Sequence, residues 1–268
     1  MSAEIKKGDD IILLQRLDNG IAKVVLNDPP LNLMTVHMNK RLSRVLDEIA
    51  EDETIRVVVV MGAGERAFSA GAHIKEFANF VHRGTMVSDK LELECEVNEK
   101  LSNLPQPTIA ALRGITLGGG IEMALCCDYR ILGESAEIGY PEIKLGLFPG
   151  GGGLARLPEI VGKTKAKELL FLGETISSKE ALRLGLVNEV LPDDKVVERA
   201  MERAEQLAKM PGESLRAIKK GVNDVYEIPI PQGVEYSLGL ISRLLSSKDA
   251  REGVNAFLEK REPKFNQK

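Results

Sequence analysis

The sequence contains few cysteines, and their spacing limits what they can do. Only three occur among the 268 residues, at Cys95, Cys126 and Cys127, and they form no CxxC pair. Two adjacent cysteines cannot bridge distant segments, so neither a disulfide framework nor a thiolate metal site is expected. We therefore expect a reducing compartment. Cys126 and Cys127 are interpreted as small apolar core residues at the end of a helix.

The chain also lacks an excess of basic residues and any long apolar run. It carries 36 Lys and Arg against 40 Asp and Glu, a formal net charge of -4. Binders of nucleic acid or of membrane surfaces depend on a broad basic field, so neither kind of partner is expected. No stretch approaches the roughly 18 apolar residues of a membrane helix. The start, MSAEIKKGDD, has no signal core or Arg-rich amphipathic pattern, which predicts a cytoplasmic protein or the matured form of an imported one.

Hydrophobic periodicity predicts an α/β protein of one large or two modest domains. Apolar residues make up 43% of the chain and charged residues 28%, as in soluble globular proteins. After Pro192 only helical patterns remain, so we place a domain boundary near residue 195, between a core at 1–195 and a helical region at 196–268. That region is expected to be an assembly surface or an intramolecular lid. The strand-like runs that alternate with helices before it lie at 10–17, 20–27, 55–62, 107–114 and 128–133.

Two helix starts are marked by capping residues. Ser177 is followed three residues later by Glu180, the spacing of a capping box, ahead of a strand at 187–191. Thr35 is the expected N-cap of a long helix, which is assigned a packing role. The apolar stripe of that helix has the three-and-four spacing of a helix buried on one face: Met38, Leu42, Val45, Leu46 and Ile49.

The segment VVVVMGAGERA, at 57–67, matches the dinucleotide-binding pattern G-x-G-x-x-A. Its context argues against that interpretation, because FSAGAH follows without an immediate helix and no acid-ended second strand lies about 20 residues on. The useful feature is the small-residue turn from Ser69 to Ala72. Backbone N–H groups in such a turn can approach a ligand closely.

Two further glycine-rich stretches each lie beside a glutamate. Glycines 118–120 lead from a strand into a helix that carries Glu122, and a helix N-terminus exposes N–H donors that favour an anion or a developing oxyanion. Glu142 precedes the glycine run 150–153, which is expected to open another helix. A helix of about two turns and a returning strand would let the two acids face each other across a cleft.

Local physics alone favours structural roles for both acids. Glu122 then pairs with a helix dipole, and Glu142 is a solvated loop acid. The three histidines, His37, His73 and His82, share no metal-ligand spacing, so no metal site is predicted. The basic ending EKREPK reads as a solvated helix end.

Four separately spaced motifs change this balance, because their order resembles the enoyl-CoA hydratase (crotonase) family. They are AFSAGAHIKEF, PTIAALRGITLGGGIEMALCCDYRI, GYPEIKLGLFPGGGG and ISSKEALRLGLVNEV, and the likeness extends to NDPPLNLMT near the start and AFLEKREPKF at the end. The resemblance implies a crotonase-like (ClpP/crotonase) spiral of β-β-α units. It also implies a C-terminal helical trimerisation region and a homotrimer or a homohexamer made of two trimers.

The resemblance also implies the chemistry. The backbone N–H groups of Ala72 and Gly119 fall on the family's oxyanion hole, which stabilises enolate-like charge on a thioester oxygen. Both glutamates of the hydratase members are present, as Glu122 and Glu142. The implied activity is reversible syn addition of water to a 2-enoyl-CoA, giving a 3-hydroxyacyl-CoA. Both acids would hold the water. In the usual assignment for similar enzymes Glu122 is the base toward water and Glu142 supplies the proton to the α-carbon, whereas a shared-water description divides the roles differently. No cofactor is expected, since coenzyme A is part of the substrate.

Contacts to coenzyme A carry over less specifically. Lys260 matches a tail lysine that reaches a coenzyme A phosphate, often from a neighbouring subunit. Two departures bear on acyl specificity: His73 replaces a common aspartate, and Tyr140 stands where smaller or polar residues are usual. The remaining implied contacts are Leu31, Ser69, Ala70, Ala72, Ile74 and Lys75.

Three alternatives stay open at this point. Within the family, the chain could be an isomerase that retains both acids, or a hydratase for a cyclic, branched or aromatic-pathway acyl-CoA. More distantly, it could be a noncatalytic or RNA-binding relative, although the acidic balance argues against RNA. Fatty-acid β-oxidation, aromatic degradation and fermentation all use this fold, so the pathway stays open.

Overall fold

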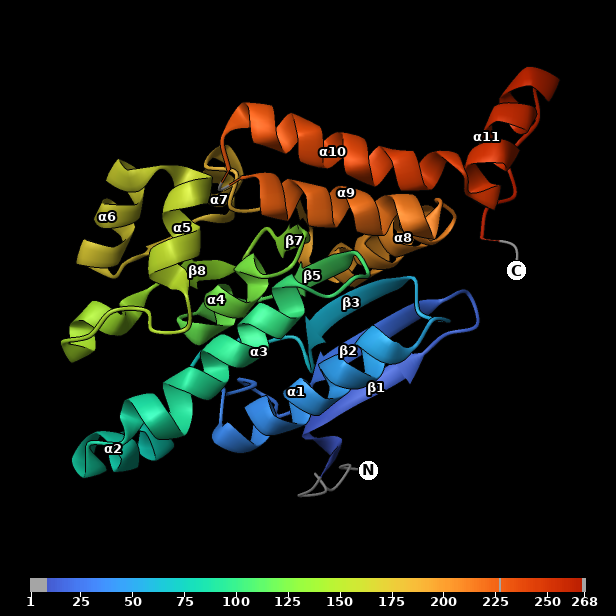
Figure 1. The fold of residues 1–268 in the computed structure, drawn as a ribbon. Coiled ribbons are helices and arrows are strands. Elements are labelled where there is room, and N and C mark those ends of the chain that lie inside the picture. The colour runs from blue at the N-terminus through green and yellow to red at the C-terminus, as the bar shows by residue number, and fades with distance from the viewer. Residues whose placement is uncertain (1–8, 227, 267–268) are drawn as a thin grey trace, which may run out of the picture.

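A computed structural model describes residues 9–226 and 228–266, and its centre is a six-stranded sheet with helices on both faces (Figure 1). The strand order is β1-β2-β3-β5-β7-β10. β1 and β2 are antiparallel, and the other neighbours are parallel. Every strand run predicted from the sequence is confirmed, as β1 (Ile12–Arg16), β2 (Ile21–Leu26), β3 (Val57–Gly62), β5 (Thr108–Leu112), β7 (Tyr129–Gly133) and β10 (Glu189–Leu191).

A second, smaller sheet lies beside the first. Its strand order is β4-β6-β8-β9, and β4, β6 and β8 run parallel to one another. Three successive turns of the chain each add one strand to the large sheet, one to the small sheet and then a helical segment: β3-β4-α2, β5-β6-α4 and β7-β8-η3. This is the predicted spiral of β-β-α units. The strands of the small sheet are β4 (Ala67–Ser69), β6 (Ile115–Leu117), β8 (Glu137–Gly139) and β9 (Thr175–Ile176).

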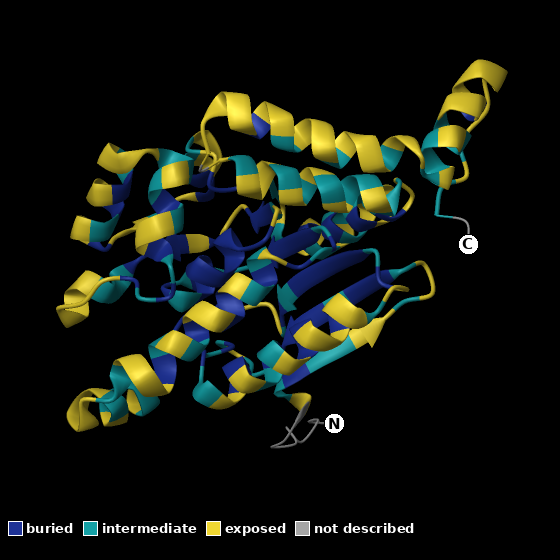
Figure 2. Ribbon diagram, viewed as in Figure 1, coloured by how far each residue is buried: buried dark blue, intermediate teal, exposed yellow. Residues whose placement is uncertain are grey.

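Alternate residues of the central strands serve two different cores. Val58 and Val60 of β3 belong to a cluster that includes the buried stripe of α1 (Val36–Glu51), while Val57 and Val59 face α8 (Val196–Ala208). The division arises because successive side chains of a strand point to opposite faces of the sheet. Figure 2 shows the strands buried between the helices. Residues 196–208 therefore help to form the core, and the boundary near residue 195 stays a prediction.

Both helix caps predicted from the sequence are confirmed, at α1 and at α7. Thr35 Oγ1 accepts a bond from the Met38 N–H at 3.0 Å, and Ser177 accepts one from the Glu180 N–H at 3.2 Å. Within 9–226 and 228–266, no helix is both long and apolar enough to cross a membrane. The remaining helices are α2 (Ile74–Arg83), α3 (Glu92–Ser102), α4 (Gly119–Leu125), α5 (Gly153–Val161), α6 (Lys163–Leu172), α7 (Ser178–Arg183), α9 (Gly212–Val225), α10 (Ile230–Leu245) and α11 (Lys248–Glu259), with short helical turns at η1 (Asp9–Ile11), η2 (Val87–Leu91), η3 (Pro141–Leu145) and η4 (Asp193–Lys195).

Gly62, the last residue of β3, explains the apparent dinucleotide motif. A Cβ at Gly62 would lie 2.4 Å from the Ala67 carbonyl oxygen and 2.5 Å from that of Phe68. Glycine is required here because the chain turns back on itself and enters β4. A short strand, rather than a phosphate-binding helix, follows the motif, so the structure agrees with rejecting a dinucleotide site.

Candidate active site

Three predicted site segments follow three neighbouring strands of the small sheet. Ser69 of β4 pairs with Thr116 of β6, and Leu117 of β6 pairs with Gly139 of β8. The carboxyl ends of parallel strands meet at one edge of a sheet, and ligands of α/β proteins commonly bind there. Ala72, Gly119 and Glu142 come two or three residues after these strands. The topology therefore brings the predicted residues to one place.

Ala72 offers a backbone N–H that takes part in no hydrogen bond within the described part of the chain. Met34 donates its N–H to the Gly71 oxygen at 2.8 Å and accepts the His73 N–H at 3.2 Å, so Met34 holds both neighbours of Ala72. Among the described residues, no acceptor takes the N–H of Ala72 itself. Ala72 is partly exposed, so this donor is accessible.

The three glycines before Glu122 each meet a different requirement. Gly118 has a φ of +53°, in the left-handed region, and a Cβ there would lie 2.8 Å from Glu142 Oε1. Gly119 begins α4, so its N–H has no acceptor within the helix. A Cβ at Gly120 would lie 2.4 Å from the Ser69 carbonyl oxygen. Bare backbone at all three positions lets α4 begin directly against the end of β4.

The two free N–H groups lie close together. A Cβ at Gly71, the residue before Ala72, would lie 3.4 Å from the Gly119 nitrogen and 2.7 Å from the Leu117 oxygen. Two donors on touching segments can bind one anionic oxygen without rearrangement, which is the arrangement that an oxyanion needs.

Glu122 is buried within the first turn of α4, with an exposed fraction of 4%. Its Oε1 accepts a bond from the Gly153 N–H at 2.7 Å. Burial raises the pKa of Glu122 to about 7, the Gly153 N–H opposes this rise, and the negative charges of Glu142 and Glu94 add to it. At neutral pH this carboxyl is close to its titration midpoint, as a general base requires.

The glycine run 150–153 lets the backbone approach that carboxyl. A Cβ at Gly151 would lie 2.9 Å from Glu122 Oε2, and one at Gly153 would lie 3.0 Å from Oε1. As predicted, the run opens a helix, since α5 begins at Gly153. Asn98, which the sequence did not single out, donates from Nδ2 to the Gly151 oxygen at 2.8 Å and so fixes the run.

Glu142 lies in η3, on the other side of the α4 N-terminus. Its Oε2 is buried without a hydrogen-bond partner among the described residues, and burial raises its pKa. An orphaned buried carboxyl oxygen is costly and calls for a partner. The negative charge of Glu142 adds to the raised pKa of Glu122, and the arrangement of the two acids across one cleft stays a prediction.

The predicted coenzyme A contacts fall into different environments. Leu31 is partly buried, and its carbonyl accepts the Ala70 N–H at 2.9 Å. Ser69 is fully buried: its hydroxyl donates to the Asn32 oxygen at 2.8 Å and accepts the Gly71 N–H at 3.2 Å. The Ser69 hydroxyl therefore turns inward and shapes the turn, and the contact of this turn with coenzyme A stays a prediction.

Ile74 and Lys75 are exposed at the start of α2. Lys260 is exposed at the end of α11, at the opposite end of the molecule from α2 (Figure 1). One chain alone therefore does not bring Lys260 to the site.

His73 and Tyr140, the two departures from the family pattern, have different environments in the structure. His73 is the N-cap of α2, and its Nδ1 accepts the Glu76 N–H at 3.2 Å, so it supplies the acceptor that a cap requires. Tyr140 is buried, and its hydroxyl has no partner among the described residues. Burial, with the charges of Glu122 and Glu142, raises the Tyr140 pKa well above its usual value. Tyr140 is therefore a neutral group near both acids.

Sequence reasoning missed one buried ion pair beside the site. Lys90 and Glu94 lie 2.6 Å apart with little or no exposure. Their i,i+4 spacing was visible in the sequence, but such pairs usually lie on solvated helix faces. Among the described residues, no group of three His, Cys, Asp or Glu side chains is arranged to hold a metal ion.

Comparisons with known proteins agree with this architecture. The family model described as "Enoyl-CoA hydratase/isomerase" matches residues 16–268. A "Probable enoyl-CoA hydratase" of Bacillus subtilis (strain 168) is 39% identical over 257 residues, covering 93% of this chain and 96% of the relative. A mitochondrial methylglutaconyl-CoA hydratase of Mus musculus is 32% identical over 271 residues, covering 98% of this chain and 86% of the relative.

A solved structure extends the likeness to three dimensions. The crystal structure of an enoyl-CoA hydratase from Bacillus anthracis superposes with a TM-score of 0.89 at 36% identity, covering 95% of this chain and 98% of that chain. The match of fold, spacing and sequence over almost the whole length establishes that this chain belongs to the enoyl-CoA hydratase/isomerase family, with the crotonase fold.

Proposed function

We propose that this protein is a hydro-lyase, an enoyl-CoA hydratase that adds water reversibly and with syn geometry to a 2-enoyl-CoA. The observation that carries the proposal is the meeting, at one sheet edge, of the buried Glu122, the half-buried Glu142 with its orphaned Oε2, and two N–H groups that have no acceptor among the described residues. Donors alone can polarise a thioester. Hydration also requires a proton acceptor and a proton donor, and the two carboxyls meet that requirement.

In this proposal the thioester oxygen accepts bonds from the N–H groups of Ala72 and Gly119. Glu122 takes a proton from the attacking water, and its pKa of about 7 leaves enough of the ionised form near neutrality. Glu142, whose pKa is also raised, delivers the proton to the α-carbon. Burial thus permits an ionised Glu122 and favours a protonated Glu142. The proposed reaction requires no resident cofactor.

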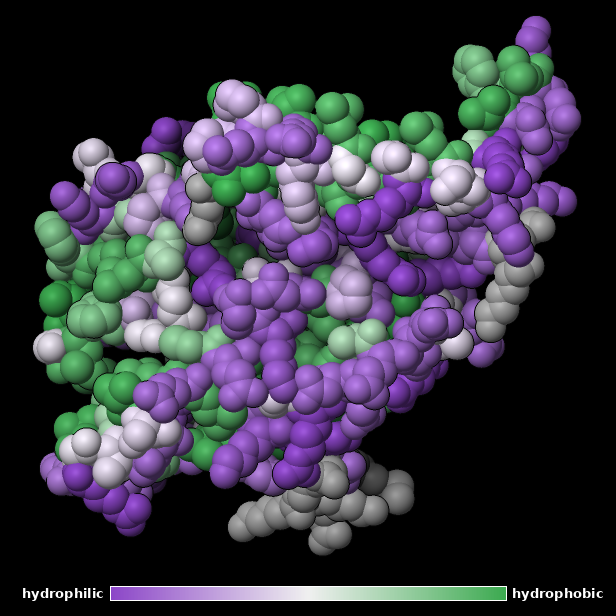
Figure 3. All heavy atoms as spheres, in the orientation of Figure 1, coloured by the Kyte–Doolittle hydropathy of each residue, from purple (hydrophilic) through white to green (hydrophobic). Residues whose placement is uncertain are grey.

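The substrate and the assembly are proposed together. An acyl-CoA would lie along Leu31, Ala70, Ile74 and Lys75, and Lys260 of another subunit would bind a phosphate. Apolar side chains remain exposed on the C-terminal helices, including Ile230 (82%) and Phe257 (84%), and Figure 3 shows apolar surface over α10 and α11. Such surface supports burial between copies of the chain, as a homotrimer or a dimer of trimers.

The test is a hydration assay with straight-chain, branched and cyclic 2-enoyl-CoA substrates, followed by the loss of absorbance of the conjugated thioester. We expect turnover by the native protein and a loss of roughly 100-fold or more in Glu122→Ala and in Glu142→Ala, each still folded. A native protein that hydrates none of these substrates, or an alanine variant that keeps its rate, would overturn the proposal. Double-bond migration without hydration would instead identify an isomerase.

A further inference from the structure

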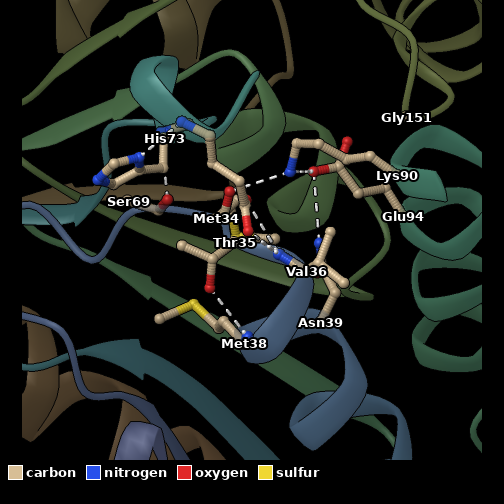
Figure 4. A network of polar contacts seen from close by, with 12 residues as sticks. Met34, Thr35, Val36, Met38, Asn39, Ser69, His73, Lys90, Glu94 and Gly151 are labelled. Carbon is tan, nitrogen blue, oxygen red and sulfur yellow. Dashed lines mark hydrogen bonds and ion pairs between the residues drawn. The ribbon is translucent and has the colours of Figure 1, made fainter. Parts of the chain in front are cut away.

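A buried lysine contacts Met34, the residue that pairs with Ala72 in an isolated β-bridge. Lys90 has no exposed surface, and its Nζ donates to the Met34 carbonyl oxygen at 3.0 Å and to Glu94 Oε1 at 2.6 Å (Figure 4). Glu94 Oε1 also accepts a bond from Asn39 Nδ2 at 3.3 Å. The network thus joins η2 and α3 to α1 and to Met34, which precedes the N-cap of α1.

The local fold turns this lysine inward. Lys90 lies in η2, a π-helical turn from Val87 to Leu91 that runs directly into α3. Short π-helical turns change which side chains face the core and occur often at functional sites. In η2, Lys90 is buried, and its ammonium contacts the Met34 carbonyl beside the site.

Met34 connects this charge to both proposed oxyanion donors. Its N–H and its carbonyl hold Gly71 and His73, the two neighbours of Ala72, at 2.8 Å and 3.2 Å. Its Cγ lies 3.7 Å from the position that a Cβ of Gly119 would occupy. A shift of the Met34 backbone would therefore turn the Ala72 N–H and disturb the contact with Gly119.

Stability alone does not explain the pair. Well-packed apolar residues often replace a buried ion pair without loss of stability. Here the ammonium is used to hold a backbone carbonyl that already accepts the His73 N–H. Because Lys90 and Glu94 neutralise each other at 2.6 Å, the main contribution of Lys90 is geometric.

From these contacts we infer that Lys90 is a positioning residue for the oxyanion hole: it fixes the Met34 carbonyl and thereby aims the Ala72 N–H at the thioester oxygen. The inference rests on the proposed function for its substrate. Glu94 and Asn39 hold the ammonium in place. Lys90 itself does not touch the reacting atoms.

The test compares two double variants that remove similar ion pairs. Lys90→Met/Glu94→Gln removes the pair behind the site. Lys219→Met/Asp128→Asn is the matched control, because Lys219 also pairs with a carboxylate, at 2.8 Å, and donates to a backbone carbonyl, that of Gln106 at 3.1 Å. Two readouts are taken: steady-state hydration of crotonyl-CoA, and the infrared carbonyl stretch of bound ¹³C-labelled crotonyl-CoA.

We expect the Lys90 double variant to lose about 10-fold to 100-fold in kcat, with KM within about three-fold of native, since a small misplacement of a catalytic donor has effects of this size. The carbonyl stretch, lowered in the native complex, should return toward its value in solution. The control should keep both. An unchanged carbonyl stretch in the Lys90 variant, or an equal loss in the control, overturns the inference.

Two further measurements keep the test decisive. If the double variant does not fold, Glu94→Gln alone, which keeps an acceptor for Lys90, should give a smaller kcat loss and a partial shift of the stretch; no change in either overturns the inference. If the native protein polarises the bound carbonyl but hydrates nothing, the proposed function fails. The role of Lys90 is then still decided by the carbonyl stretch.

Discussion

Glu122 accepts a 2.7 Å hydrogen bond from the backbone N–H of Gly153, 31 residues further along the chain. The bond ties the first turn of α4 to the first residue of α5. Burial raises the pKa of this carboxyl while the Gly153 N–H lowers it, and burial dominates, giving about 7. We therefore expect the ionisation of this single side chain to influence the stability of the protein and, under the proposed function, its activity.

Through Glu122, stability is predicted to fall as the pH rises from about 4.5 to about 7, and to level off above that. The folded state holds the Glu122 proton up to about pH 7, whereas the ordinary pKa is 4.5, so folding is favoured at low pH and this contribution is lost as pH rises through 7. Glu122→Gln has no such titration. The free energy of unfolding of the variant minus that of the native protein should increase by about 3 kcal/mol from pH 4.5 to pH 8.

Urea unfolding at several pH values measures this difference. The exposed Glu51 of α1 provides the control variant, Glu51→Gln. A pH-independent gap between native protein and Glu122→Gln would contradict the raised pKa of Glu122.

Hydration should depend on pH through the same group. Below about pH 7 Glu122 is protonated and cannot accept a proton from water, so kcat/KM should fall about tenfold per pH unit on the acid side. The residual activity of Glu122→Gln should lack this acid limb. A native profile that stays flat down to pH 5.5 would exclude Glu122 as the base.

Gly119→Ala is predicted to fold normally and lose activity. Among the described residues, a Cβ at this position would meet Met34 Cγ alone, at 3.7 Å, which is an ordinary van der Waals contact. The added methyl would lie beside the N–H meant for the thioester, so we expect kcat/KM to fall at least about tenfold. Thermal unfolding and hydration rates measured on one preparation test this, and full activity would argue against a bound thioester at Gly119.

Gly118→Ala should lose stability as well as activity. This residue has a φ of +53°, and its Cβ would lie 2.8 Å from Glu142 Oε1. Both strain and displacement of Glu142 follow, so we expect lower stability together with lower activity. A variant as stable as Gly119→Ala would show that the backbone at Gly118 tolerates a side chain.

Only one of the three thiols should react in the folded protein. Cys95 is exposed, whereas Cys126 and Cys127 are buried, and burial raises the pKa of each to about 12. The thiolate is the reactive form, so the buried pair should stay unmodified. Alkylation followed by intact mass measurement should find one label in native protein, none in Cys95→Ser, and three after unfolding. A label on Cys126 or Cys127 in native protein would contradict their burial.

Lys260 provides a test of the proposed phosphate contact. Lys260→Ala should raise KM for a coenzyme A thioester but not for the matching pantetheine thioester, which lacks the adenosine phosphates. Lys248→Ala, at the other end of α11, is the control and should change neither. An equal effect on both thioesters would place the role of Lys260 in assembly instead.

The elements with long regular patterns were predictable from the sequence. The six strands of the large sheet and the Thr35 cap follow from runs of apolar residues and from one capping side chain. The small sheet was not predicted strand by strand, because β4, β8 and β9 have only two or three residues. So short a run carries no readable alternation.

The candidate site was predictable only in part. Glu122, Glu142 and the glycines were recognised through the family resemblance, since local physics favoured structural roles for both acids. The inward turn of the Ser69 hydroxyl depends on Asn32, 37 residues away in the chain, and the burial of Lys90 depends on a π-helical turn. Neither leaves a pattern in the neighbouring residues, because each is fixed by a tertiary contact.

The spiral distributes the site over three successive turns, each contributing its group after one short strand. The donors follow β4 and β6, while the second acid follows β8. Exchange of the segment after β8 would alter proton delivery while the grip on the thioester stays the same. If the proposed roles hold, the site is modular, because the groups that would bind the thioester and the group that would deliver the proton follow different strands.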